Sequence, residues 1–211
     1  LKLEDWLRSL PENMHNTREN LEYWTSKDLS TNFVHLHIDF NYFNQLLFYQ
    51  FLHGNIDLAP SSSTAFLYAK KCQRHAMELC QLIHLARNTP RAQPLYSLGG
   101  HVLTIASTVI LHIFLFSANE AEQHSARRLL EQNFEFLTTL STFWPCLDAS
   151  FARFKAFHNA CMCCLDDSHF QMDRWMLKFM LEFAEPVTER WEKWGDEQST
   201  PPEWSLARIG L

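Results

Sequence analysis

Side chains that could bind a metal ion are concentrated in one short stretch of the chain. His158 and Cys161 are followed closely by Cys163 and Cys164, and histidine and cysteine are the usual ligands of zinc. Adjacent residues of a helix point about 100° apart, so these four side chains cannot all converge on one ion. No second Cys-x-x-Cys pair completes a site elsewhere in the sequence. The stretch therefore favours a buried patch of soft side chains, and we expect no metal or other cofactor in these residues.

A second group of residues has the types needed for acid–base catalysis. His35, His37 and Asp39 include a possible base and a carboxylate to orient it. Residues two apart in a helix point to nearly opposite sides, so only His35 and Asp39 can pair. Glu131 and Glu135 share a helical face, which is common on solvated helices. No P-loop, GxSxG, HExxH or GxGxxG motif occurs, and we expect that the chain is not an enzyme.

The histidine group lies within the aromatic-rich segment of residues 33–52. Read as a helix, its apolar residues recur at spacings of four, three, four and four and form one stripe: Leu36, Phe40, Phe43, Leu47 and Phe51. Asn41, Asn44 and Gln45 lie off this stripe. Residues 34–42 also alternate between apolar and polar, as a strand would, but no other segment alternates to pair with them. We therefore predict a central helix, with Ser30 and Thr31 as caps.

The rest of the sequence predicts further helices with short connectors. Their ranges are residues 1–10, 61–87, 95–117, 119–143, 146–165 and 170–191. Residues 11–32 read as a polar connector, and Gly99 with Gly100 permits close approach of a neighbour. The sequence thus predicts an all-α fold, an irregular bundle of about seven helices around the central aromatic-rich helix. We expect a single domain over residues 1–195, followed by an irregular tail over residues 196–211.

Composition limits the possible partners. Apolar residues make up 46% of the 211 residues, and 17 are phenylalanine, which predicts a folded core. The net charge of −6 opposes direct binding to a phosphate backbone. The six cysteines lie mostly in apolar helical patterns, which is typical of reduced thiols. The apolar run over residues 102–118 is short for a membrane span and lacks basic flanks, so we expect a buried core helix and no membrane partner.

Five segments, taken in order, resemble the middle homology region of fungal zinc binuclear cluster transcription factors. They are LEDWLRSLPENM, FVHLHIDFNYFNQLLFYQFLHGN, AKKCQRHAMELCQLIHLA, HVLTIASTVILHIFLFSA and FEFLTTLSTFWPCLDASFARF. The resemblance covers roughly residues 1–165. It departs from the family at residues 52–55, where Leu-His-Gly-Asn stands in place of a Leu-His-Arg-Pro-like turn.

The resemblance implies a regulatory domain of a nuclear, RNA polymerase II transcription factor. The six-cysteine zinc cluster that reads DNA in this family is absent from these residues, so it implies zinc and DNA binding only in another part of the parent protein. Members of the family use this region to restrain an activation segment, to sense small-molecule inducers or to dimerise. The partners that we expect for this chain are therefore a small-molecule inducer, a second copy of the chain or a co-regulator protein. It identifies no ligand residues in this chain.

A small-molecule-sensing domain is the alternative reading. Its apolar pocket would lie between the helix of residues 33–52 and the helix of residues 102–118. We select as candidate ligand residues those that offer a hydrogen-bonding tip on an otherwise apolar face: His37, Tyr42, Tyr49 and His112. The sequence favours the alternative in which all four are satisfied polar groups in the core or at its boundary.

Overall fold

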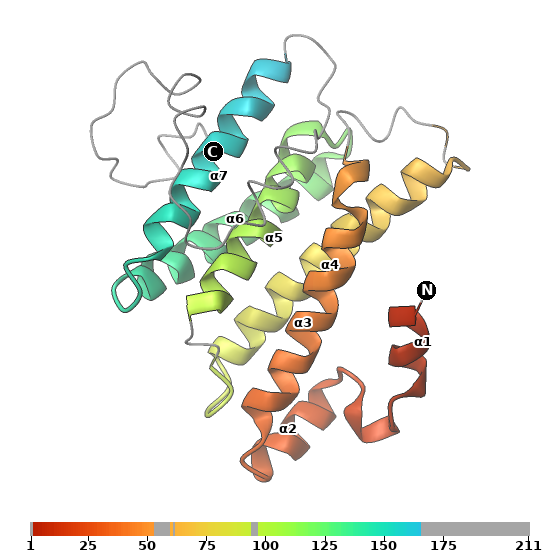
Figure 1. Cartoon of the computed structure of the whole chain (residues 1–211), viewed down its shortest axis with the longest axis vertical. Helices are drawn as coiled ribbons and strands as arrows, with labels where there is room; N and C mark the ends of the chain where they lie inside the picture. The colour runs from red at the N-terminus through yellow and green to blue at the C-terminus, as the bar shows by residue number, and fades with distance from the viewer. Residues whose placement is uncertain (1, 53–59, 61, 94–96, 166–211) are drawn as a thin grey trace.

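The computed structural model describes residues 2–52, 60, 62–93 and 97–165, and these residues form an all-α fold (Figure 1). Seven α-helices and two short 3-10 helices follow one another, without a strand in the described residues: α1 Lys2–Ser9, η1 Glu12–Met14, α2 Arg18–Ser26, α3 Ser30–Phe48, η2 Tyr49–Phe51, α4 Thr64–Arg87, α5 Ser97–Phe116, α6 Glu120–Ser141 and α7 Leu147–Leu165. The predicted all-α, multi-helix class is confirmed. The predicted helix of residues 170–191 and the tail of residues 196–211 lie outside the described residues.

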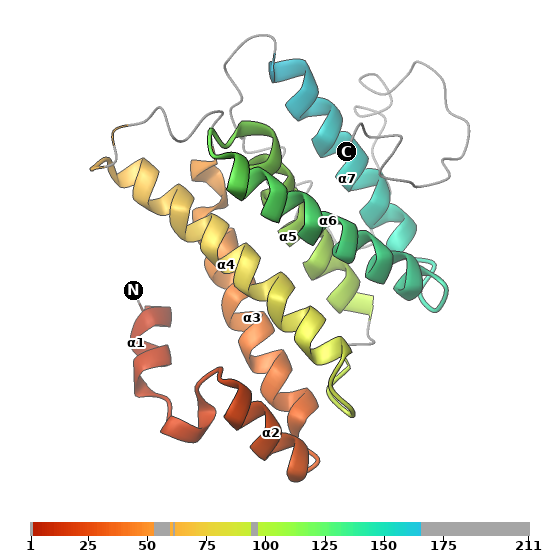
Figure 2. The same ribbon diagram turned by 180° about the vertical axis from the view of Figure 1, so that it is seen from behind.

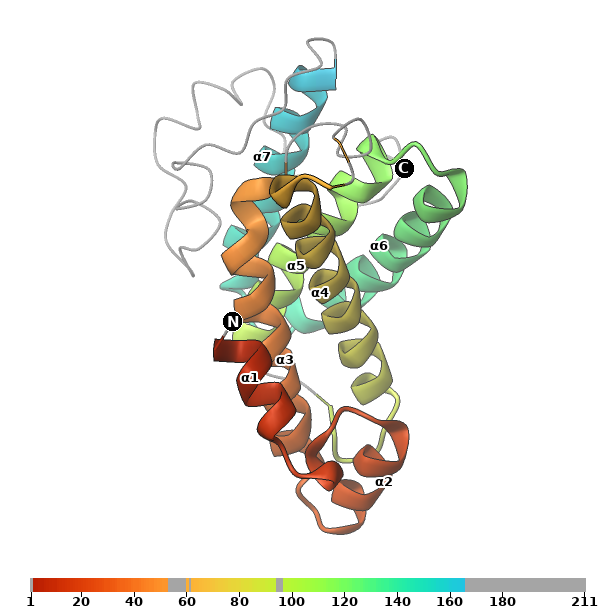
Figure 3. The ribbon, with the colours of Figure 1, turned by 90° about the vertical axis from the view of Figure 1, so that its right-hand side faces the viewer.

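The long helices lie in two layers. In Figure 1, α3, α5 and α7 lie toward the viewer, and Figure 2 shows α4 and α6 on the opposite side. α5 packs against α4, α6 and α7, and α4 also packs along α3. α2 lies beside the beginning of α3, and Figure 3 shows α1 alongside α3. The first three helices therefore extend one edge of the bundle.

α5 is the most enclosed helix. Every residue from Val102 to Ile113 is buried, and Leu98–Phe116 is long and apolar enough to cross a membrane by length and composition. The fold itself buries 83% of an 18-residue window of that stretch, which supports the interpretation as a core helix. Gly100 in the first turn allows the close contact that the sequence predicts, because a Cβ there would lie only 2.6 Å from both methyl groups of Leu147 on α7. The two helices meet at this glycine.

The buried face of α3 differs from the predicted stripe. Phe43 is 53% exposed and Leu47 is 48% exposed, whereas Asn41, Asn44 and Gln45 are buried. The apolar stripe read from the sequence is therefore not the buried face of the helix at Phe43 and Leu47. The helix is rotated so that its amide side chains face the bundle. Trp6 of α1 stacks on Phe40 at 5.5 Å between ring centroids, so Phe40 is covered from outside the main layers.

Several predicted helix ends are confirmed by their caps. The Ser63 hydroxyl oxygen accepts a hydrogen bond from Phe66 N at 3.1 Å at the start of α4, and Asn119 Oδ1 accepts from Ala121 N at 2.9 Å at the start of α6. The predicted caps of α3 are wrong. The hydroxyls of Ser30 and Thr31 instead donate to the carbonyl oxygen of Arg91, at 2.9 and 2.8 Å. They tie α3 to the connection between α4 and α5.

The predicted connector of residues 11–32 contains a helix, α2. Thr17 caps it by accepting a hydrogen bond from Asn20 N at 3.2 Å. The Asn20 side chain donates to the carbonyl oxygens of Glu12 and His15, each at 2.8 Å. Trp24 Nε1 donates to Asn13 O at 2.8 Å. These contacts fold residues 12–26 into a compact unit that the polar composition of the segment does not reveal.

Candidate functional site

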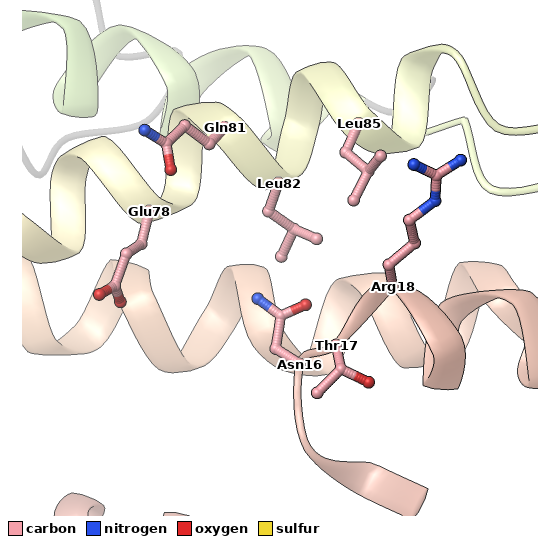
Figure 4. A pocket seen from close by; sticks show the side chains of 7 residues that line it. All are labelled: Asn16, Thr17, Arg18, Glu78, Gln81, Leu82 and Leu85. Atoms are coloured by element: carbon pink, nitrogen blue, oxygen red, sulfur yellow. The ribbon is translucent and has the colours of Figure 1, made fainter.

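A pocket of about 190 Å³ lies between the beginning of α2 and the middle of α4 (Figure 4). α4 presents residues three or four apart on one side of the helix, and the turn that leads into α2 supplies the other side. The lining residues are Asn16, Thr17, Arg18, Glu78, Gln81, Leu82 and Leu85. Leu82 is buried and forms an apolar floor, while the charged and amide groups surround the opening. The pocket is thus polar at its rim and apolar at its base.

The pocket carries both signs of charge. Arg18 Nε donates to Glu22 at 3.1 Å along the exposed side of α2. Glu78 is 3.7 Å from Arg74 Nε and 3.7 Å from His75 Nδ1, and partial burial raises the pKa of its carboxyl. The lining residues include neither a cysteine nor a histidine that could act as nucleophile or base. A guanidinium, a carboxylate and two amides around an apolar base can form hydrogen bonds and ion pairs with a small polar group.

A chain of buried hydrogen bonds lies next to this pocket, between α3, α4 and η1. His37 Nε2 contacts Met14 O at 2.9 Å, and Asn41 Nδ2 donates to His37 O at 3.0 Å. Asn41 Oδ1 contacts His75 Nδ1 at 2.8 Å, and Arg74 contacts His75 Nε2 at 3.2 Å. An amide oxygen only accepts and a guanidinium only donates. The neutral His75 ring therefore carries its proton on Nδ1, and His37 carries its own on Nε2.

The environment of His75 keeps its ring neutral. Burial lowers its pKa to about 4, with further contributions from the charges of Arg74 and Lys71. Burial also lowers the pKa of His37, against the opposing effect of its hydrogen bond to Met14. A proton on His75 Nε2 would remove the acceptor that faces Arg74 and would charge a buried ring, so protonation of His75 opposes the folded state.

We expect His75 to make the fold sensitive to acid. An unfolded histidine takes up a proton near pH 6.5, whereas folded His75 stays neutral down to about pH 4. The stability that it contributes is therefore present above pH 6.5 and is lost as the pH falls from 6.5 to about 4. Between pH 6.5 and pH 5 this loss amounts to about 1.5 kcal/mol.

Urea unfolding at several pH values measures this loss. In His75→Asn the amide can still donate to Asn41, but it does not titrate. The wild-type chain should lose about 1.5 kcal/mol more than this variant between pH 6.5 and pH 5. Equal losses in the two proteins would contradict the assignment of acid sensitivity to His75.

A second polar cluster joins α4, α5 and α6 deep in the bundle. Asn133 Oδ1 contacts His84 Nε2 at 2.7 Å. Asn133 Nδ2 donates to Ser107 Oγ at 2.9 Å and to Cys80 Sγ at 3.2 Å. Asn133 and Ser107 are fully buried. One asparagine thus joins three helices, which fixes their relative positions without offering a group to a ligand.

The structure separates the four candidate ligand residues into different environments. Tyr49 is fully buried, and its hydroxyl pairs with Thr108 of α5. Because Thr108 donates its own proton to Ile105 O at 2.7 Å, Tyr49 is the donor, which agrees with the pKa raised by its burial. His112 is buried one helical turn beyond Thr108 and lies against Phe116, with 4.8 Å between ring centroids.

The other two candidates lie away from that pair. His37 faces Met14 in the hydrogen-bond chain described above. Tyr42 is half-buried and lies beside Phe43, with 5.6 Å between ring centroids. Tyr49 thus contacts α5 one helical turn from His112, but the described contacts do not bring all four residues to one site.

Sequence reasoning did not identify the α2–α4 pocket. The Asn16-Thr17 cap followed by Leu21 and Trp24 at helical spacing is the signal that α2 leaves in the sequence.

Among the described residues no group of three or more histidine, cysteine or carboxylate side chains is arranged to hold a metal ion. His158 and Cys161 are both buried on α7.

No protein-family model, curated protein sequence or solved structure matches the chain.

Proposed function

We propose that the chain is the regulatory domain of a nuclear RNA polymerase II transcription factor whose zinc cluster and DNA contacts lie outside these residues. The observation that supports this proposal is the correspondence between the resembling segments and the helices. The first four segments fall on α1, α3, α4 and α5 in that order, and the fifth spans the junction of α6 and α7. The chain acts through contacts that change the output of an activation segment, not through catalysis.

The charge of the chain also supports the proposal that DNA binding lies outside these residues and that these residues regulate activity. A net charge of −6 opposes approach to DNA phosphates. An acidic domain attached to a DNA-bound protein stays away from the duplex and remains free to contact other protein segments. DNA recognition in the parent protein therefore rests on the zinc cluster, and these helices provide control.

A reporter assay tests the proposal. The chain is placed between a heterologous DNA-binding domain and a strong activation segment, and reporter output is compared with a fusion that carries a flexible linker of equal length. We expect several-fold lower output with the chain than with the linker. A variant that loses its fold should restore the output, and an exposed-surface variant should not. Output equal to that of the linker fusion would overturn the proposal.

Small-molecule sensing is the second candidate, and the α2–α4 pocket is the observation that favours it. Arg18 and Glu78 would contact opposite charges or dipoles of a small polar ligand. A thermal-shift screen with sugars, amino acids and pathway intermediates should then raise the melting temperature in a saturable manner. Glu78→Gln should weaken that response. A shift that this variant leaves unchanged would place the ligand elsewhere.

A further inference from the structure

Few buried side chains hold the N-terminal segment, residues 2–26, against the bundle. Among these described residues only Leu21 is buried, and all other buried members of the described hydrophobic core lie at residue 33 or later. Figure 2 shows α1 and α2 on one side of α3 and α4, with α6 and α7 on the other side. A segment that buries little apolar surface opens at a lower free energy than the core. We therefore expect residues 2–26 to separate from α3 and α4 more easily than the long helices separate from one another.

This segment covers two buried histidines. Trp6 of α1 stacks on Phe40 of α3, and the Phe40 ring meets the ring of His75 on α4 edge to face, with 5.7 Å between centroids. The carbonyl oxygen of Met14 in η1 pairs with His37 Nε2 at 2.9 Å. The rings of Phe40, His37 and His75 are all buried. Separation of the segment would therefore remove contacts that shield these rings from water.

Charged groups from two helices face His75. They are Lys71, Arg74 and Glu78 of α4 and Glu4 of α1. Lys71 Nζ donates to Glu4 at 2.6 Å, and Arg74 Nε lies 3.7 Å from Glu78, so the cations and carboxylates are already paired. Burial is the largest cause that lowers the pKa of His75 to about 4, and the two cations lower it further against the effect of Glu4. A proton on His75 would thus add a positive charge at a buried position.

His37 has a second histidine of the segment near it. Burial lowers the pKa of His37 against the effect of its hydrogen bond to Met14, and the charge of His15 lowers it further. Nε2 of His37 already carries a proton, so a second proton goes to Nδ1 and leaves the hydrogen bond to Met14 in place. Its cost is a buried charge and, when His15 is also protonated, repulsion between the segment and α3. Protonation of His37 therefore favours separation, as protonation of His75 does.

We propose that residues 2–26 form an acid-released cover, which protonation of His75 and His37 frees from α3 and α4 while the long helices stay packed. The released state exposes the side of α3 and α4 that carries Phe40 and Asn41, together with Leu82 at the base of the pocket. His75 takes up a proton near pH 6.5 when it is exposed to water but only near pH 4 under the cover. Closure is therefore strongest above pH 6.5 and weakens as the pH falls from 6.5 to about 4. This inference does not depend on the proposed regulatory role.

Hydrogen exchange of the 211-residue chain, read by mass spectrometry and corrected for the intrinsic pH dependence of exchange, measures this opening. At pH 7 the amides of α2 should be at least about tenfold less protected than those of residues 102–113 in α5. Between pH 7 and pH 5 the protection of α2 should fall about twentyfold, the factor that the two pKa values of His75 give. Equal protection of α2 and α5 at pH 7 would overturn the proposal, because the segment would then open only with the whole fold.

Three substitutions assign the pH dependence to its histidines. His75→Asn keeps a donor toward Asn41 and does not titrate, and it should remove most of the twentyfold fall. His37→Gln keeps a donor toward Met14 and should remove a smaller part. His124→Asn is the matched control, because His124 is exposed on α6, and it should show the full fall. A fall in His75→Asn equal to that of the wild-type chain would overturn the proposal.

A urea series at pH 5 tests the same opening without a substitution. Release of residues 2–26 exposes less surface than unfolding of the whole chain. Urea should therefore increase the exchange of α2 with a smaller slope than the exchange of α5. Equal slopes would mean that acid opens the whole fold at once and would overturn the proposal.

Discussion

Replacing Phe154 with alanine is expected to lower the free energy of unfolding by about 3–5 kcal/mol. Phe154 on α7 is 1% exposed and meets the Phe134 ring edge to face, with 4.8 Å between ring centroids. Its removal leaves a cavity between α6 and α7, which share few other contacts. The surrounding helices are long and anchored elsewhere, so they cannot collapse fully into the space.

The matched control is the same substitution at an exposed position. Phe143, in the connection between α6 and α7, is 66% exposed, and Phe143→Ala should change stability by about 0.5 kcal/mol or less. Urea denaturation of the two variants and the wild-type chain measures the difference directly. A loss at Phe154 as small as the loss at Phe143 would show that α7 does not pack on α6 as described.

The parts of the fold that depend on local sequence could be predicted. Ser63 and Asn119 each cap the helix that follows by a hydrogen bond within three residues, so short-range chemistry determines where α4 and α6 begin. Ser30 and Thr31 have the same chemistry, but the carbonyl of Arg91 lies within reach in the fold. A contact across about sixty positions of sequence has no local signal.

The orientation of α3 could not be predicted for a related reason. Nearly the whole circumference of this helix is apolar or amide, so periodicity alone does not decide which side is buried. The packing decides it. The Asn41 amide meets His75 of α4 at 2.8 Å, and Cys72 Sγ donates to the backbone carbonyl of Gln45 at 3.3 Å. These contacts with α4 hold this side of α3 inward and leave Phe43 outside.

The candidate ligand residues show a similar limit. Selecting polar tips on apolar faces correctly finds groups that pair inside the bundle, as Tyr49 does with Thr108. The rule does not distinguish a group that awaits a ligand from one that already has a protein partner. The α2–α4 pocket depends instead on how residues 12–18 fold back onto α4, which is a tertiary event. Sequence periodicity identifies single helices. It carries no information on a pocket that forms between two of them.

Gly100 is a position where an added side chain should strongly lower the free energy of unfolding. We expect Gly100→Val to lower the free energy of unfolding by about 3 kcal/mol, at the upper end for an overpacked core. A Cβ at this position would meet Leu147 Cδ1 and Cδ2 at 2.6 Å and Cγ at 3.2 Å. Leu147 is fully buried, so its side chain has no open space into which to turn. Either Leu147 leaves its rotamer within the core or α5 and α7 move apart, and both changes disturb the packing at this contact.

A double-mutant cycle of Gly100 and Leu147 distinguishes the effect of this contact on stability from the low intrinsic helix propensity of glycine. Glycine is itself unfavourable in a helix by about 1 kcal/mol, so Gly100→Val would be mildly stabilising if Leu147 were not in contact. Leu147→Ala alone should also destabilise the chain, because it leaves a cavity at the same place. Together the two changes should cost about 1–3 kcal/mol less than the sum of the single losses. Additive losses in a double-mutant cycle would mean that Gly100 and Leu147 do not touch, and α7 would then be placed differently against α5.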